Sequence, residues 1–367
     1  KEFFGDENVL PIWVADMDFE TPDFIRDAII NRARHPIYGY TFRSDAFFDF
    51  IISWMKRRHN WEVKKEWISF SPGIVPAINL AVLAYSEPGD PVLIQPPVYF
   101  PFFRAIKDHN RILTENVLVN KDSRYFIDFE DFEKKAAEAG LFILCHPHNP
   151  VGRLWTDEEL TEMLRICRKH NVTIVSDEIH SDLMLNGNRH NPFLKIPGTG
   201  DITLSFYAPS KTFNLAGLST SFLIIPNKEL KLRFDKTLDH LHLGMGNIFG
   251  AEALKAAYNE GEDWLEELKS YLNDNYRFLI AYLKENIPEI KVTPTEATYL
   301  IWLDFRSFGM DDKQLKEFII REAGLGLNDG PSFGSGGSGF QRINIAAPRA
   351  ILEEGLQQLN KAIRKIR

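Results

Sequence analysis

Short apolar runs alternate with helical patterns between about residues 90 and 225. The runs are apolar on both faces and rich in β-branched residues, as strands covered by helices on two sides should be. We predict five such strands: Pro91–Gln95, Leu141–Cys145, Val172–Ser176, Ile202–Phe206 and Ser221–Ile225. This alternation is typical of an α/β fold with a mostly parallel sheet.

One helix of this region has a clear beginning in the sequence. Thr156 and Glu159 form a Ser/Thr-x-x-Glu capping box, in which each side chain bonds the other residue's backbone N–H. The helix is expected to continue to Lys169.

The pattern changes after about residue 228, where longer helices dominate. The predicted elements are helices over Lys228–His240 and Asn247–Asn286, a strand over Thr298–Leu303, a helix over Asp311–Ala323, a strand over Gln341–Ile345 and a helix over Ala350–Ile366. We therefore expect a large domain over residues 36–260. A small α+β domain would combine residues 1–35 with residues 261–367.

Charge and cysteine content narrow the class of protein. The formal net charge of -8 is spread along the chain, so neither a nucleic acid nor a membrane is an expected partner. Cys145 and Cys167 lie in apolar segments without a CxxC pair, so we expect buried thiols and no metal site. We find neither a spanning apolar run nor a signal peptide, and the start at Lys1 resembles a trimmed terminus. A cytoplasmic location is the expectation.

Polar residues follow three of the predicted strands. Asn149 comes after Leu141–Cys145, Asp177 after Val172–Ser176, and Lys211 after Ile202–Phe206. Ligands of open α/β sheets bind beyond the carboxyl ends of the strands. Taken singly, each residue has an ordinary explanation. Asn149 could be a turn residue, Asp177 a helix cap or salt-bridge partner, and Lys211 a surface lysine. A lysine among small and apolar residues would nevertheless have a lowered pKa and a nucleophilic amine.

A glycine-containing turn opens a helix after position 70. Its sequence is Ser71-Pro72-Gly73-Ile74-Val75-Pro76-Ala77. Free backbone N–H groups at such a helix start suit a phosphate, although most turns of this kind bind nothing.

In this order, these four features resemble the fold-type I pyridoxal 5′-phosphate (PLP) enzymes of the aminotransferase class I/II family. The resemblance runs from Leu10 to the last helix. It implies an α/β, PLP-dependent transferase-like (aspartate aminotransferase) fold, with a mostly parallel seven-stranded sheet between helices and a small α+β C-terminal domain. Several motifs are similar to the MalY/PatB-type cystathionine β-lyases (C–S lyases). These are Trp13–Phe19, Tyr38–Tyr40, Ser71–Ala77, Ser176–His180 and Pro209–Asn214.

The resemblance implies a catalytic role for three residues. Lys211 would bind PLP as a Schiff base and later act as the base at the substrate Cα. Asp177 would pair with the pyridinium nitrogen. Tyr99 would stack on the ring. Asn149 would donate to the phenolic oxygen, and His180 stands where aminotransferases usually carry a tyrosine.

The resemblance also implies contacts at the cofactor phosphate. The expected contacts are Gly73, Ile74, Val75 and the Ser210 hydroxyl. Tyr40 would reach the phosphate of a partner subunit, which implies a homodimer with shared active sites. Two departures put the strength of phosphate binding in doubt: Ala208 replaces a common serine, and Ser219 replaces a common lysine or arginine.

Arg342 would bind the carboxylate of an amino-acid substrate by a two-pronged hydrogen bond, with Arg349 as the weaker candidate. The residues expected to contact the substrate or shape its pocket are Trp13, Ala15, Phe333 and the segment His240–Phe249.

Three functions are compatible with these residues. The first is β C–S lyase activity on L-cystathionine or a related sulfur amino acid, which gives pyruvate, ammonia and a thiol. The second is an aminotransferase, which uses the same residues up to the branch point. The third is a regulatory protein that retains the PLP fold and, without a basic patch, would need a protein partner. Intact Lys211, Asp177 and Asn149 favour an enzyme.

Overall fold

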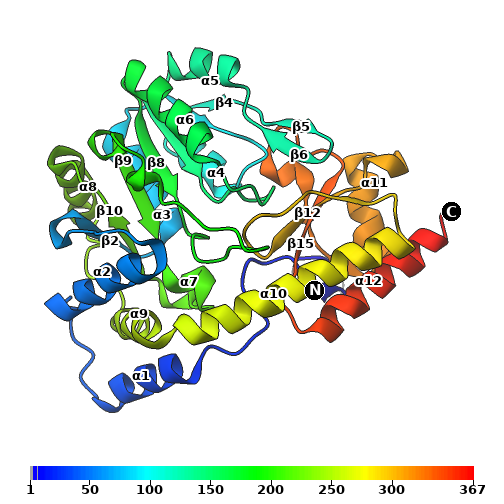
Figure 1. Ribbon diagram of the computed structural model, residues 1–367, viewed down its shortest axis with the longest axis horizontal. Coiled ribbons are helices and arrows are strands. Elements are labelled where there is room, and N and C mark those ends of the chain that lie inside the picture. Colours follow the sequence, from blue (N-terminus) through cyan, green and yellow to red (C-terminus); the bar gives the residue numbers. More distant parts are fainter. Residues whose placement is uncertain (1–2, 6) are drawn as a thin grey trace.

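A seven-stranded sheet forms the centre of the larger part of the molecule (Figure 1). The computed structural model describes residues 3–5 and 7–367. In sheet order the strands are β2 (Ile68–Ser71), β10 (Ser221–Ile224), β9 (Thr203–Tyr207), β8 (Thr173–Asp177), β7 (Leu141–Cys145), β3 (Pro91–Ile94) and β4 (Ile112–Glu115). Only β10 runs antiparallel to its neighbours among these strands. The predicted α/β fold with a mostly parallel sheet is confirmed.

Helices cover both faces of this sheet. Val92 and Ile94 pack with α3, α4 and α8, whereas Leu93 between them packs with α5 and α6 on the other face. The helices of this part are α1 (Asp23–Arg34), α2 (Asp45–His59), α3 (Ile74–Tyr85), α4 (Pro101–Lys107), α5 (Phe129–Ala136), α6 (Asp157–Lys169), α7 (Pro209–Thr212), α8 (Lys228–His240) and α9 (Ile248–Glu260). Burial on both sides explains why these strands lack polar alternation.

A second, antiparallel sheet lies towards the C-terminus. Its strands, in order, are β11 (Lys291–Val292), β12 (Leu300–Asp304), β15 (Phe340–Asn344) and β14 (Asn328–Asp329). The helices α10 (Glu262–Asn286), α11 (Asp312–Glu317) and α12 (Arg349–Arg364) belong to this part. Two further strand pairs are β1 (Leu10–Pro11) with β13 (Leu325–Gly326) and β5 (Val119–Lys121) with β6 (Arg124–Phe126). The predicted domain boundaries stay a prediction.

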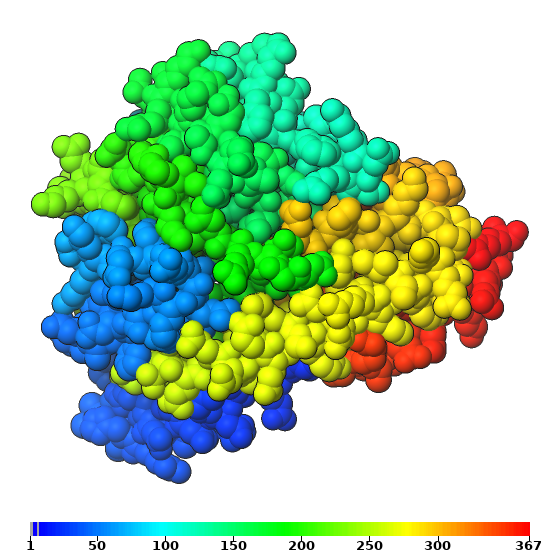
Figure 2. Space-filling view, viewed as in Figure 1, coloured from blue at the N-terminus to red at the C-terminus, as the bar shows by residue number. Residues whose placement is uncertain are grey.

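The segment from Asn247 to Asn286 is two helices, so the prediction of one continuous helix was wrong. The Asn247 side chain caps α9, and Gly261 separates α9 from α10. A Cβ atom at Gly261 would collide with the Ala257 carbonyl and the Phe213 ring, so the break depends on a residue without a side chain. Figures 1 and 2 show α10 running along the molecule towards the C-terminal sheet. No helix in the described part has the length and apolarity needed to cross a membrane.

The helix predicted over Asp311–Ala323 also differs from the structure. It begins as α11 with an Asp311–Gln314 capping box and changes to a π-helical turn over Phe318–Glu322. The sequence pattern does not distinguish an α-helix from a π-helical turn here. Leu315 in α11 and Ile319 in the π-helical turn are both buried, as in a continuous amphipathic helix.

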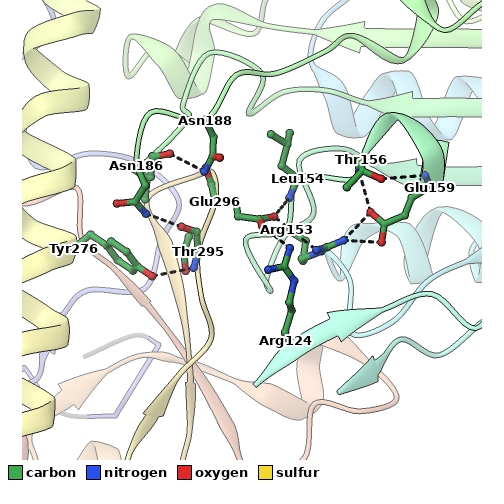
Figure 3. A network of polar contacts seen from close by, with 11 residues as sticks. Arg124, Arg153, Leu154, Thr156, Glu159, Asn186, Asn188, Tyr276, Thr295 and Glu296 are labelled. Atoms are coloured by element: carbon green, nitrogen blue, oxygen red, sulfur yellow. Dashed lines mark hydrogen bonds and ion pairs between the residues drawn. The ribbon is translucent and has the colours of Figure 1, made fainter. Parts of the chain in front are cut away.

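The capping box of α6 is confirmed and belongs to a larger polar network (Figure 3). Glu159 accepts a hydrogen bond from the Thr156 N–H at 2.8 Å, and both its oxygens lie 2.7 Å from Nη2 of Arg153. Glu296, from the loop before β12, accepts from Arg124 at 2.9 Å and from the Leu154 N–H at 2.8 Å. The network therefore joins the turn after β7 to the second sheet.

Replacing Glu159 with alanine should destabilise the protein by about 3 kcal/mol, because the buried Arg153 would lose its close carboxylate partner. A urea titration followed by circular dichroism measures the change in the free energy of unfolding. Glu158→Ala, one position earlier on the same exposed turn, should have a much smaller effect. Equal destabilisation by the two substitutions would contradict a structural role for the Arg153–Glu159 pair.

Candidate active site

A cavity of about 300 Å³ lies at the carboxyl edge of the large sheet. Residues after β2, β3, β7, β8 and β9 meet there because the carboxyl ends of parallel strands share one edge. The antiparallel β10 contributes from its amino end. The lining residues are Ala15, Pro72, Gly73, Ile74, Val75, Pro76, Tyr99, Cys145, Asn149, Asp177, Ile179, His180, Ser210, Lys211, Ala216, Ser219 and Thr220.

Lys211 lies in α7, the short helix after β9, and its amine donates a 2.5 Å hydrogen bond to the Ala15 carbonyl. Burial lowers the pKa of Lys211 to about 8, helped by the positive charge of Arg342 and opposed by Asp16 and Asp177. Near physiological pH most of the amine is still protonated, but the neutral fraction, which a nucleophile or a base requires, is far larger than for an exposed lysine.

Asp177 is the last residue of β8 and is buried. One carboxylate oxygen accepts a 3.1 Å hydrogen bond from the Ile179 N–H. Burial raises the pKa of Asp177 to about 7, while the Ile179 N–H and the Lys211 charge oppose the rise. A buried carboxylate of this kind gains stability from a cationic partner inside the cavity.

Asn149 follows β7 in a turn, and its backbone N–H lies 3.4 Å from the Cys145 sulfur. Its side-chain oxygen accepts a 3.0 Å hydrogen bond from Nη1 of Arg342. That bond fixes the orientation of the amide, so its N–H₂ group is the end left to donate elsewhere.

Arg342, on β15, stands behind Asn149 and does not line the cavity. Its Nη2 donates to the Asn328 side chain at 2.5 Å and to the Trp13 carbonyl at 3.1 Å. Its guanidinium lies 4.9 Å from the centre of the Phe333 ring. Burial lowers the pKa of Arg342 to about 10, so it keeps its charge at neutral pH. Nε has no hydrogen-bond partner among the described residues.

His180 and Tyr99 lie on the cavity wall in uncharged forms. Burial, with the charges of Lys211 and Arg342, lowers the pKa of His180 to about 3. Burial and the Asp177 charge raise the pKa of Tyr99 to about 12. At neutral pH the imidazole and the phenol are therefore both hydrogen-bonding groups without charge.

One end of the cavity is suited to a phosphate. Gly73 caps α3 with φ = 151°, a value that an L side chain rarely adopts, and the first free N–H groups of the helix follow it. The side chains of Ser210, Ser219 and Thr220 belong to the same lining. The lining therefore includes three hydroxyl-bearing side chains, although Ala208 replaces a common serine and Ser219 replaces a common lysine or arginine.

Some predicted site residues lie elsewhere. Tyr40 is 89% exposed and does not line the cavity. The Trp13 ring packs against Phe3 and Phe4, and only its carbonyl reaches Arg342. Arg349 donates a 2.8 Å hydrogen bond to the Asn275 side chain and does not line the cavity. Ala15, in contrast, lines the cavity and accepts the Lys211 hydrogen bond.

Several cavity residues were missed from the sequence. Cys145 and Ile179 adjoin predicted strand ends, so the rule that located Asp177 could also have found them. Thr220 was missed because it precedes an antiparallel strand. Tyr299 lies outside this lining but donates a 3.0 Å hydrogen bond to the same Ala15 carbonyl that Lys211 contacts, and no local motif marks it.

The described residues fit PLP. The Lys211 amine, with its lowered pKa, suits an aldehyde, and the buried Asp177 suits a protonated ring nitrogen. The α3 start and three hydroxyls suit the phosphate. The fold and this site thus define a class, the α/β enzymes that hold a phosphorylated cofactor at a buried lysine.

Comparison with known proteins identifies the family. The model of the family "Aminotransferase class I and II" matches residues 8–359, so the chain belongs to this family. It is 44% identical to cystathionine beta-lyase PatB of Bacillus subtilis (strain 168), over 99% of this chain and 94% of that protein. It is 31% identical to protein MalY of Escherichia coli (strain K12), over 99% of this chain and 94% of that protein.

A solved structure gives the same result. The crystal structure of cystalysin from Treponema denticola, which contains a PLP cofactor, superposes with a TM-score of 0.96 at 39% identity. The match covers 99% of this chain and 93% of that chain. The predicted fold and the resemblance to the MalY/PatB-type branch are confirmed.

Proposed function

We propose that this protein is a PLP-dependent β C–S lyase that acts on L-cystathionine or a related sulfur amino acid. The observation that carries the proposal is the cavity in which Lys211, Asp177 and Asn149 meet beside the start of α3. The lyases among its relatives support this choice of reaction. L-Cystathionine and water would give homocysteine, pyruvate and ammonia, with the Cβ–S bond broken and no net oxidation.

PLP, when bound, supplies an electron sink for the pair of electrons left at Cα. Lys211 would hold the cofactor and, with its amine free, would remove the Cα proton at Nζ. Its lowered pKa suits both tasks. The same ammonium can then deliver the proton to the departing sulfur, which leaves as a thiol.

Other residues orient the cofactor ring. Asp177 would keep a proton on the ring nitrogen, and the Asn149 amide would donate to the phenolic oxygen. Tyr99, on the cavity wall, would stack against the ring and exclude water from it. The neutral His180 contributes a hydrogen bond without adding a charge near Lys211. Gly73, Ile74 and Val75, at the start of α3, and Ser210 would hold the phosphate.

Arg342 would bind the substrate carboxylate. Its Nε has no hydrogen-bond partner among the described residues, and its Nη2 could exchange the Trp13 carbonyl for a carboxylate. Ala15 and the backbone of Trp13 would form the adjoining wall of the substrate pocket.

The second candidate function is an aminotransferase, because the family name covers that reaction and the residues named above serve it as well. The two are separated by supplying L-cystathionine or L-cysteine with and without 2-oxoglutarate. A lyase turns over steadily without the keto acid and makes no glutamate. Turnover that requires the keto acid and forms glutamate would replace the lyase by the aminotransferase.

The rate at which the apoprotein captures PLP should depend on pH. Protonated Lys211 cannot attack an aldehyde, so the rate should rise about tenfold per pH unit below about pH 8 and level off above it. Stopped-flow absorbance of the bound cofactor measures this rate. A rate that stays constant from about pH 6 to pH 9 would show that Lys211 is not the attacking group.

We also propose that the chain forms a homodimer in which Tyr40 reaches the partner's active site. Ile37, Tyr38, Tyr40 and Phe42 are exposed apolar residues. Arg43 donates to the Met245 carbonyl at 2.9 Å and joins them to a second exposed apolar segment, Leu241–Met245. An apolar surface of this kind is typical of an interface.

Sedimentation velocity tests the dimer. The protein should sediment at about twice the chain mass of 42.3 kDa, and Phe42→Asp should shift it towards the monomer. Leu232→Asp, at another exposed apolar position, on α8, is the matched control and should remain dimeric. A monomeric wild-type protein would exclude the shared site.

A cytoplasmic location is also part of the proposal. Both cysteines are buried free thiols, which suits a reducing compartment. Fractionation of source cells with an antibody against the protein tests it, and recovery in an extracellular fraction would contradict it.

A further inference from the structure

A second cavity, of about 650 Å³, lies away from the active site. It is formed by the end of α2, the loop Ser181–Asn191, Lys195 and the first turns of α10. In Figure 2 these segments meet where the light-blue, green and yellow atoms adjoin. Its volume is within the range of small-molecule sites, and the residues of the active site do not line it.

Basic side chains dominate the lining of this cavity. Its charged lining residues other than histidine are Arg57, Arg58, Arg189, Lys195 and Lys269, opposed by Asp182 and Glu266. Glu266 is shared by Arg58 at 2.7 Å and Lys269 at 3.1 Å, and Arg57 is paired with Glu262 at 3.1 Å. Asp182 is occupied by His59 at 3.3 Å and by the Thr212 hydroxyl at 3.0 Å.

Two cations of the lining remain without a carboxylate partner among the described residues. Lys195 donates only to the His59 carbonyl, at 2.9 Å, and Arg189 makes no hydrogen bond or ion pair to any described residue. An ammonium and a guanidinium on the wall of one concave site attract a doubly charged anion, because nothing in the lining neutralises them.

The loop that carries Arg189 is held in place before any ligand arrives. The Asn188 side chain donates to the Leu185 and Glu296 carbonyls at 2.9 and 3.3 Å. Asn186 donates to the Asn273 side chain at 2.7 Å and to the Thr295 carbonyl at 3.2 Å. Figure 3 shows both asparagines beside the loop that contains Thr295 and Glu296. A fixed loop reduces the entropy lost when a ligand binds.

We propose that this cavity is a binding site for a small phosphate-bearing molecule with two or more negative charges, held chiefly by Arg189 and Lys195. Its inner wall adjoins the catalytic segment, because the Asp182 carboxylate accepts from Thr212, the residue after Lys211. Occupancy of the cavity thus has a direct structural connection to the active site.

Isothermal titration calorimetry with inorganic pyrophosphate as the probe tests the proposal. The titration uses the PLP-saturated protein at constant ionic strength. The active site is then occupied at the start of α3, and the screening of charges by salt does not change. The double variant Arg189→Gln/Lys195→Gln should bind pyrophosphate at least roughly tenfold more weakly than the wild type, since two charge-assisted contacts are lost.

Arg321→Gln/Lys236→Gln is the matched control, because it removes the same charges from exposed positions outside the cavity lining. It should bind pyrophosphate like the wild type. A loss of affinity confined to the cavity variant cannot come from pyrophosphate binding in the active site. Equal affinity in all three proteins, or no binding to the wild type, would overturn the proposal. The outcome does not depend on which reaction the enzyme catalyses.

Discussion

Replacing Lys211 with alanine should lower kcat by roughly 10⁴-fold or more and remove the visible absorbance of covalently bound PLP. The amine is buried, has a lowered pKa and is the only lysine lining the described cavity. Its loss removes both the attachment point and the base at Cα. An absorbance scan of the purified variant and a pyruvate assay measure the two effects separately.

Lys228→Ala, at an exposed position at the start of α8, is the control and should behave like the wild type. If the absorbance of the bound cofactor persisted unchanged in the Lys211 variant, the assignment of Lys211 as the attachment point of PLP would be wrong. Loss of activity with retained absorbance would leave Lys211 as a base but move the attachment to another amine.

Asp177→Asn should lower kcat by roughly 10³-fold while the covalent absorbance remains. Asparagine has nearly the same shape and can still accept from the Ile179 N–H, so the fold of the site should be preserved. A neutral amide cannot hold a proton on the ring nitrogen, so the ring becomes a poorer electron acceptor. The effect should appear in kcat more than in KM.

Asp263→Asn changes an exposed carboxylate of α10 in the same way and should leave kcat unaltered. A small change in kcat for the Asp177 variant, similar to that of this control, would mean that the buried carboxylate has only a structural function.

Much of the fold and the site can be predicted because the central strands are apolar on both faces and the chemistry follows their carboxyl ends. Leu141–Cys145 was predicted with its observed bounds, and β8 and β9 begin and end one residue later than predicted. Asp177, Asn149 and Lys211 then meet at one edge, as the geometry of a parallel sheet requires.

The remaining features depend on tertiary contacts that leave no local signal. Gly261 separates α9 from α10, and Phe213, distant in sequence, leaves no room for a side chain there. Asn328 holds Arg342 across a strand pair, and Tyr299 shares the Ala15 carbonyl with Lys211. Thr220 enters the cavity only because β10 runs antiparallel, which its apolar sequence does not reveal.

The central claim is tested most directly by a product assay of the purified, PLP-loaded protein with L-cystathionine as sole substrate. Pyruvate, ammonia and homocysteine should form steadily and in equal amounts without any added keto acid. If none of the three products forms beyond one turnover, the β C–S lyase assignment for L-cystathionine is contradicted.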